Sequence, residues 1–180
     1  MRTIGVVVLM LIVAFVFTSS QVLSVQPPRL PLTQVLKVID GDTLDVLLDG
    51  EEIRVRLLGI DTPERGQSLY YEAKERLQEL AGARIYLEAD DEEQDRYGRY
   101  LFWIWSEDGL LINAQLVEEG LADCYYRPSF RGRKHAGELL LRALEACGNK
   151  VGIWSKDYGR KLVSILWIVA PTHVGAFFLS

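Results

Sequence analysis

The chain has 180 residues, 49% of them hydrophobic, and its formal net charge is −5. This length suits one domain, and the apolar fraction is large enough for a packed core. The acidic balance excludes binding to a polyanion through net charge alone, so any affinity for nucleic acid would depend on local clusters of basic residues.

The N-terminal segment differs in composition from the rest of the chain. One arginine precedes an unbroken apolar run at residues 4–17, and small and polar residues follow it. This pattern predicts a secretory signal peptide cleaved after Ser20 or Ser24, or an uncleaved membrane anchor, although a spanning helix needs about 20 apolar residues. We assign residues 1–24 to this segment and the proline-rich residues 25–31 to a linker. The following domain is therefore expected outside the cytoplasm, secreted or attached to the cell membrane.

A β-hairpin follows a first predicted strand at residues 32–39. Residues 44–48 and 53–57 largely alternate between apolar and polar side chains, which is typical of strands with one buried face. The Asp-Gly pair between them predicts a tight turn. On the second strand, Arg56 is expected to point away from the apolar face, at the rim of the sheet.

Acidic side chains flank this hairpin on both sides. Asp42 lies where the first strand of the hairpin begins, and Asp61 lies just beyond the end of its second strand. These two points are at the same end of an antiparallel pair. The pairing should bring Asp42 and Asp61 together, and Pro63 ends the ladder because it cannot donate a backbone hydrogen bond. Carboxylates and an arginine gathered in this way can hold a hard cation and a phosphodiester together. Each fragment alone also fits a polar turn or an acidic helix start.

Periodicity and turn residues place the remaining elements. Apolar residues recur at helical spacing after Ser68, the predicted N-cap, and Gly82 ends this helix. We interpret the acidic run at residues 90–95 as a solvated turn and not as a second cation site. The later predicted elements are a strand at 84–88, the acidic loop at 90–95, an aromatic strand at 100–105, a short helix at 112–119, an extended segment at 121–126 and a helix at 132–147.

Residues 161–180 form an apolar tail that is interrupted by one Pro-Thr-His break. As a helix, its residues 162–180 would span roughly 28 Å, close to the ~30 Å hydrocarbon core of a bilayer. It is a candidate membrane-spanning segment, and the alternative is a segment that packs on the domain or stays disordered. Basic residues flank both apolar segments, so the orientation in a membrane stays open.

A second cluster with the character of a site is Asp95-Arg96-Tyr97-Gly98-Arg99, just before the aromatic strand. Its two arginines lie on either side of a glycine that permits a tight turn. Such a turn can present a guanidinium fork to a phosphate. Beside the hairpin arginine, this cluster supplies a second arginine for a pentavalent phosphorus transition state.

The stretch from about residue 32 to residue 155 resembles the staphylococcal nuclease (thermonuclease) family in the order and spacing of its motifs. The matching pieces are Val38-Ile39-Asp40-Gly41-Asp42-Thr43, Arg56-Leu57-Leu58-Gly59-Ile60-Asp61-Thr62-Pro63-Glu64, Asp95-Arg96-Tyr97-Gly98-Arg99, Gly120-Leu121-Ala122 and Ile153-Trp154-Ser155. The resemblance implies an α+β domain at residues 32–160, with a five-stranded OB-fold β-barrel and three helices. It also implies hydrolysis of DNA and RNA phosphodiesters with one calcium ion, Ca2+.

Carried over to this sequence, the resemblance implies a calcium site with few protein ligands. Asp42 and Asp61 would be the carboxylate ligands, and the Thr62 backbone carbonyl would be a third. Asp40 would contact the ligands without binding the ion itself. Because calcium takes about 6–8 oxygen ligands, water and a substrate phosphate must complete the shell.

The resemblance also implies catalytic roles. Arg56 would contact the scissile phosphate, and Arg99 would stabilise the leaving oxygen and the charge that develops on phosphorus. Glu64 would be the general base or the group that positions the attacking water. Arg96 stands where the family usually has a lysine and would bind the substrate.

Three tyrosines, Tyr97, Tyr125 and Tyr126, are candidates for contact with the substrate, and which of them stacks on a base stays open. The protein is expected to be a monomer. The alternative function is a catalytically idle OB-fold module that binds nucleic acid or protein, and the intact set of carboxylates and arginines favours the nuclease. Cys124 and Cys147 could pair in an exported protein, but the sequence does not give their separation.

Overall fold

The computed structural model describes residues 30–125 and 132–155, with the side chains of residues 92 and 93 excepted. The predicted signal peptide or anchor, most of the linker, the apolar tail and Tyr126 lie outside the described residues. Within the described ranges, no helix combines the length and the apolar character needed to cross a bilayer.

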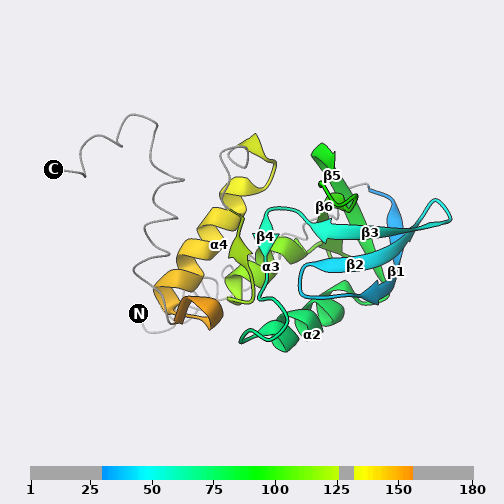
Figure 1. Cartoon of the computed structure of the whole chain (residues 1–180). Coiled ribbons are helices and arrows are strands. Elements are labelled where there is room, and N and C mark those ends of the chain that lie inside the picture. The colour runs from blue at the N-terminus through cyan, green and yellow to red at the C-terminus, as the bar shows by residue number, and fades with distance from the viewer. Residues whose placement is uncertain (1–29, 126–131, 156–180) are drawn as a thin grey trace, which may run out of the picture.

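Five strands close into a barrel in the order β1-β2-β3-β6-β5 (Figure 1). Neighbouring strands are antiparallel except for β3 and β6, which pair in parallel. The strands are β1 (Leu32–Val38), β2 (Thr43–Leu48), β3 (Glu51–Leu57), β5 (Arg84–Gln94) and β6 (Tyr100–Ser106).

The helices pack against one end and one side of this barrel. In Figure 1, α3 lies between α4 and the barrel, and α2 lies along the barrel wall. In the described ranges these are α2 (Tyr70–Ala81), α3 (Ile112–Glu118), α4 (Ala136–Asn149) and the 3-10 turn η2 (Gly152–Ser155), with a small sheet of β4 (Ile60–Asp61) and β7 (Asp123–Cys124). The predicted α+β fold with a five-stranded OB-type barrel and three helices is confirmed.

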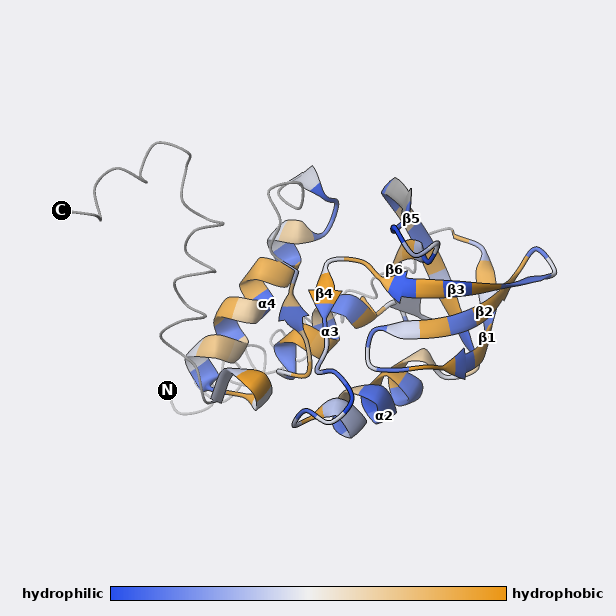
Figure 2. Cartoon of the chain, in the orientation of Figure 1, coloured by the Kyte–Doolittle hydropathy of each residue, from blue (hydrophilic) through white to orange (hydrophobic). Residues whose placement is uncertain are grey.

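The hairpin of β2 and β3 forms as its alternation predicts. Leu44 pairs with Val55 and Val46 with Ile53 across the ladder, and Leu44, Val46 and Val55 are fully buried in the barrel. Figure 2 shows a mostly hydrophilic α2 and a more hydrophobic α4. This contrast agrees with their packing, since α4 buries more of its residues than α2 does.

Four element boundaries differ from the sequence-based expectation. The predicted N-cap Ser68 is wrong, because α2 begins after Leu69, which has a left-handed backbone with φ 69° and no side-chain cap. The acidic run after Ala89 is not a loop but the continuation of β5, with an irregular register against β6 before Gln94. The extended segment shrinks to β7, and α4 begins at Ala136.

Candidate active site

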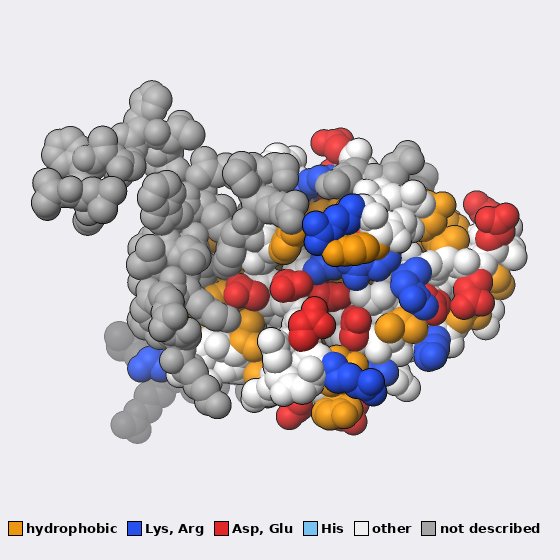
Figure 3. Space-filling model, in the orientation of Figure 1, with side chains coloured by type: hydrophobic (Ala, Val, Ile, Leu, Met, Phe, Trp, Pro, Cys, Tyr) orange, Lys and Arg blue, Asp and Glu red, His pale blue; other side chains and the backbone are white. Residues whose placement is uncertain are grey.

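The predicted site residues line one pocket of about 510 Å³. Its walls come from the turn before β2, the end of β3, β4 with the loop that follows it, and the turn between β5 and β6. Every predicted site residue lines it except Tyr126, which lies outside the described residues. Figure 3 shows acidic side chains beside basic ones in the middle of the face drawn. The described members are Asp40, Asp42, Arg56, Asp61, Thr62, Glu64, Arg96, Tyr97, Arg99 and Tyr125.

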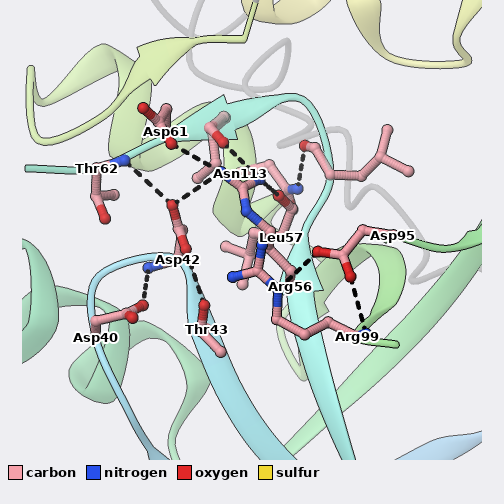
Figure 4. Close-up of polar contacts among 12 residues, drawn as sticks. Asp40, Asp42, Thr43, Arg56, Leu57, Asp61, Thr62, Asp95, Arg99 and Asn113 are labelled. Atoms are coloured by element: carbon pink, nitrogen blue, oxygen red, sulfur yellow. Dashed lines mark hydrogen bonds and ion pairs between the residues drawn. The ribbon is translucent and has the colours of Figure 1, made fainter. Parts of the chain in front are cut away.

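Asp42 is the most enclosed carboxylate of the pocket, with only 7% of the residue exposed. Its Oδ1 accepts a hydrogen bond from Thr43 Oγ1 at 2.9 Å, and its Oδ2 accepts one from the Thr62 backbone N–H at 3.2 Å. Its own N–H donates to Asp40 Oδ1 at 3.1 Å (Figure 4). The hairpin ladder thus brings the turn before β2 into contact with the segment after β4.

Arg56 is the central cation of this arrangement. Its Nη1 donates to the backbone oxygens of Leu57 at 3.2 Å and Ile60 at 2.9 Å. Its Nη2 lies 2.8 Å from Asp61 Oδ1 and 3.3 Å from Asp42 Oδ2 (Figure 4). Only 12% of the Arg56 side chain is exposed, so this guanidinium sits inside the site and not loosely at its rim. The two predicted calcium ligands therefore meet at one guanidinium nitrogen.

The charge of Asp42 is poorly compensated in this enclosed position. Burial raises the pKa of Asp42 to about 6 from its ordinary value of 3.8, and the charge of Asp40 adds to the rise. The charge of Arg56 and hydrogen bonds from Thr43 and Thr62 lower this pKa without cancelling the effect of burial. Within the described residues, no three His, Cys, Asp or Glu side chains form a ready-made metal cluster. The oxygen donors fit a hard cation that takes part of its shell from water and substrate.

Asp95 organises the turn that carries the second arginine. Its carboxylate accepts hydrogen bonds from the N–H groups of Tyr97 at 2.9 Å and Arg99 at 3.0 Å, and from Arg99 Nε at 2.7 Å. Burial of Asp95 opposes its ionisation, but these hydrogen bonds outweigh burial and lower its pKa. Gly98 adopts a φ of 77° in this turn, a conformation that glycine reaches without steric cost. Sequence reasoning included Asp95 in the motif but gave it no role.

The parallel pairing of β3 with β6 sets Arg56 beside this turn. Arg56 pairs with Leu101, two residues after Arg99. The exposed ring of Tyr97 lies against both neighbouring guanidinium groups, with its centroid 4.7 Å from Arg96 Cζ and 5.6 Å from Arg99 Cζ. These distances lie within the range of cation–π contacts.

Tyr125 and Glu64 occupy the other walls of the pocket. The Tyr125 N–H donates to Gly59 O at 2.8 Å, and the Tyr125 ring lies 5.6 Å from Arg56 Cζ. Glu64 is exposed, and its backbone N–H donates to Gln67 Oε1 at 2.8 Å. Across residues 30–125 and 132–155, no hydrogen bond or ion pair engages the Glu64 carboxylate. The carboxylate is therefore accessible to a water molecule in the pocket.

A family model described as "Staphylococcal nuclease homologue" matches residues 54–156 of the chain. The chain belongs to this family. It is 38% identical over 133 residues to "Protein ParB" of Escherichia coli, which covers 69% of this chain and 73% of that protein. It is 35% identical to "Micrococcal nuclease" of Shigella flexneri, over 68% of this chain and 72% of that protein. It is also 35% identical to "Thermonuclease" of Staphylococcus hyicus, over 68% of this chain and 75% of that protein. The resemblance derived from the motifs is thereby confirmed.

In this staphylococcal nuclease homologue, Asn113 is a supporting residue that sequence reasoning missed. It is fully buried in α3. Its Oδ1 accepts a hydrogen bond from the Ile104 N–H at 2.9 Å, and its Nδ2 donates to Leu58 O at 2.9 Å. The amide therefore fixes the end of β3, which carries Arg56, to the middle of β6. Its place between two apolar residues, Ile112 and Ala114, in the predicted short helix was the only signal in the sequence.

Gly41 allows the carboxylate-bearing turn to approach its neighbours closely. A Cβ at this position would lie 2.8 Å from both Ala73 Cβ and Thr62 Oγ1, which is closer than real Cβ contacts. The turn that carries Asp40 and Asp42 thus packs directly onto α2 and onto Thr62. Within this family member, the site depends on a small residue at a position where the fragment alone also fitted an ordinary polar turn.

Proposed function

We propose that this chain is a calcium-dependent nuclease that hydrolyses phosphodiester bonds of DNA and RNA. The chain is a nuclease hydrolase, as its family membership establishes. The calcium requirement and the range of substrates are our proposal. The observation that carries it is the meeting of Asp42 and Asp61 at Arg56, in a pocket that also contains Glu64 and Arg99.

Asp42 and Asp61 would hold calcium, with the Thr62 backbone carbonyl as a third protein ligand and Asp40 behind them. When bound, the ion would polarise a phosphate oxygen and an adjacent water molecule. The buried charge of Asp42 supports this proposal, because a cation would compensate it. All four residues offer oxygen atoms, the ligands that calcium prefers.

The side chains of Glu64, Arg56 and Arg99 would act directly on the water and on the phosphate. Glu64 takes the proton of the attacking water as the water oxygen bonds to phosphorus and the bond to the leaving oxygen breaks. Some of the Arg56 N–H groups would donate hydrogen bonds to the phosphate. Arg99 would neutralise charge on phosphorus and on the leaving oxygen. The exposed Glu64 carboxylate and the neighbouring arginines support this division of roles.

Arg96 and the tyrosines would bind the rest of the substrate. Tyr97 is 68% exposed and lies against Arg96 and Arg99. An exposed ring beside cationic groups can stack on a base whose phosphates the arginines contact. Tyr125 offers a second ring, whose centroid lies 5.6 Å from Arg56 Cζ, and Tyr126 follows it directly in the sequence.

We also propose that the enzyme is a monomer that acts outside the cytoplasm. The apolar run at residues 4–17 supports export, and residues 161–180 would add a membrane attachment. Intact mass of the protein from medium and membrane fractions tests this proposal. A mature form that lacks residues 1–20 or 1–24 is expected, and a form that begins at Met1 would mean an anchor in place of a signal peptide.

The function is tested by incubating the purified full chain with single-stranded DNA and with RNA, in calcium or in a calcium chelator. Cleavage of both polymers in calcium is expected, with none in chelator. The Glu64→Gln variant is the control for a contaminating nuclease. Binding of the polymers without cleavage by the parent would favour the idle OB-fold module.

A further inference from the structure

Arg133 lines the same pocket as Arg56 and Arg99, although no motif in the sequence singles it out. It reaches the pocket from a separate element, the segment that leads into α4. Only 11% of its side chain is exposed. An arginine enclosed at a pocket wall differs from the solvated arginines of the surface, because its position is set by the packing around it.

Asp90 on β5 forms a long ion pair with this guanidinium. Asp90 Oδ1 lies 3.9 Å from Arg133 Nη1, and 3% of the Asp90 side chain is exposed. Asp90 Oδ2 accepts hydrogen bonds from Trp103 Nε1 at 2.8 Å and from the Lys134 N–H at 3.2 Å. Burial opposes the ionisation of Asp90, but these bonds and the charge of Arg133 outweigh it and lower the pKa of Asp90. The carboxylate therefore stays charged near neutral pH.

The next two residues fix the same segment to β5. Lys134 Nζ donates to Ala89 O at 2.7 Å and lies 3.4 Å from Glu88 Oε1. His135 Nε2 lies 2.9 Å from Glu88 Oε2, and the His135 ring meets the Trp103 ring edge-on at 5.0 Å between centroids. Consecutive residues thus hold the backbone at Arg133 in place, so its side chain is pre-organised at the wall.

We propose that Arg133 binds a substrate phosphate that flanks the scissile phosphate. The inference rests on the proposed nuclease function and adds a subsite to it. Arg56 on β3 and Arg99 in the turn before β6 serve the reacting phosphate, whereas Arg133 approaches from the segment before α4. A polynucleotide carries a negative charge at every nucleotide. With a net charge of −5, the chain depends on arginines of this kind to hold it.

Two measurements on the full chain test Arg133→Ala, with Arg142→Ala as the matched control. Arg142 lies on α4 outside the pocket and pairs with Glu118 at 3.1 Å. The first measurement is the salt dependence of binding to a fluorescent single-stranded oligonucleotide of about 12 nucleotides, in the Glu64→Gln background with calcium. The second is kcat/KM on that oligonucleotide and on a dinucleoside monophosphate, which has no flanking phosphate.

Arg133→Ala is expected to weaken oligonucleotide binding about tenfold and to reduce the slope of log K against log salt by about 0.7. The ratio of kcat/KM on the oligonucleotide to that on the dinucleoside should also fall about tenfold. Arg133→Lys should recover part of the loss, and Arg142→Ala should change neither measurement.

Binding within twofold of the parent would overturn the inference. Equal losses on both substrates, with a lowered thermal midpoint, would also overturn it, because they would mean that Arg133 only supports the fold. A parent that cleaves while Arg133→Ala changes nothing would refute this subsite alone. A parent that neither binds nor cleaves would refute the proposed function and this inference with it.

Discussion

Asp42→Asn should stabilise the ion-free protein while weakening its binding of calcium. The asparagine has nearly the same shape and keeps an oxygen that can accept from the Thr62 N–H, the bond that Asp42 Oδ2 now accepts. It removes a carboxylate that is costly to ionise in its buried position. The same substitution removes one of the two carboxylates proposed to hold calcium.

The size of this effect follows from the pKa of Asp42, which burial raises from 3.8 to about 6. Between these values the folded protein binds a proton that the unfolded chain has released, so stability falls as pH rises through this window and stays lower above it. The difference in pKa corresponds to about 3 kcal/mol. We therefore expect Asp42→Asn to raise the free energy of unfolding by up to about 3 kcal/mol above pH 6, or roughly 10 °C in thermal midpoint.

The assay is a series of melting curves of the full chain and the variant in chelator, from about pH 4 to pH 8. The difference between the two proteins isolates Asp42, because the carboxyls whose pKa values are lowered, such as those of Glu88 and Glu119, are present in both. That difference should be small near pH 4 and largest above pH 6. Added calcium should then stabilise the parent far more than the variant.

Two results would refute this reasoning. One is a variant that melts below the parent at pH 7 in chelator, which would mean that Asp42 stabilises the ion-free fold through Arg56. The other is a difference in midpoint that does not change with pH, because an effect without pH dependence cannot come from the ionisation of Asp42.

Three further results are expected. Cleavage should require calcium and fail with magnesium alone, because magnesium demands a tighter octahedral shell; equal rates in the two metals would contradict the proposed site. Arg99→Ala and Glu64→Gln should each lower kcat by about 10²–10³-fold and shift the thermal midpoint by only a few degrees; turnover of single-stranded DNA within threefold of the parent would refute their roles. Arg56→Ala should abolish cleavage. It should also lower the stability of the ion-free protein by about 3 kcal/mol, because Asp42 would be left buried without its cation. Chemical denaturation in chelator checks this, and an unchanged midpoint would show that Arg56 does not compensate the charge of Asp42.

The fold was predictable where local sequence and tertiary packing agree. The hairpin of β2 and β3 has both a period of two and an Asp-Gly turn, so its register followed from the sequence. The acidic run in β5 was misjudged because charged residues rarely continue a strand. Asp90 does so because Trp103 Nε1 on β6 donates to its carboxylate, and a partner on another strand is invisible to a local pattern.

The site was predictable in part for the same reason. Hairpin geometry alone placed Asp42 and Asp61 at one end of the sheet. It did not predict that both carboxylates contact the same guanidinium, because that contact depends on the Arg56 rotamer and on the backbone oxygens of Leu57 and Ile60. Asn113 was missed because its partners lie on β6 and at the end of β3, and nothing in its neighbourhood along the chain points to them.

The parallel pairing of β3 with β6 also constrains the order in which the enzyme folds. The hairpin that carries Arg56 can form early, because a two-residue turn joins its strands. Arg99 reaches the same pocket only when β6 pairs with β3, and β4, α2 and β5 separate these two strands along the sequence. Closing such a long connection is slow. A chain stopped at the hairpin stage would hold Asp42 and Arg56 but would lack the second arginine. Competence for cleavage should therefore appear only when the barrel closes, so a newly made chain would be harmless to nucleic acid until its last barrel strand is in place.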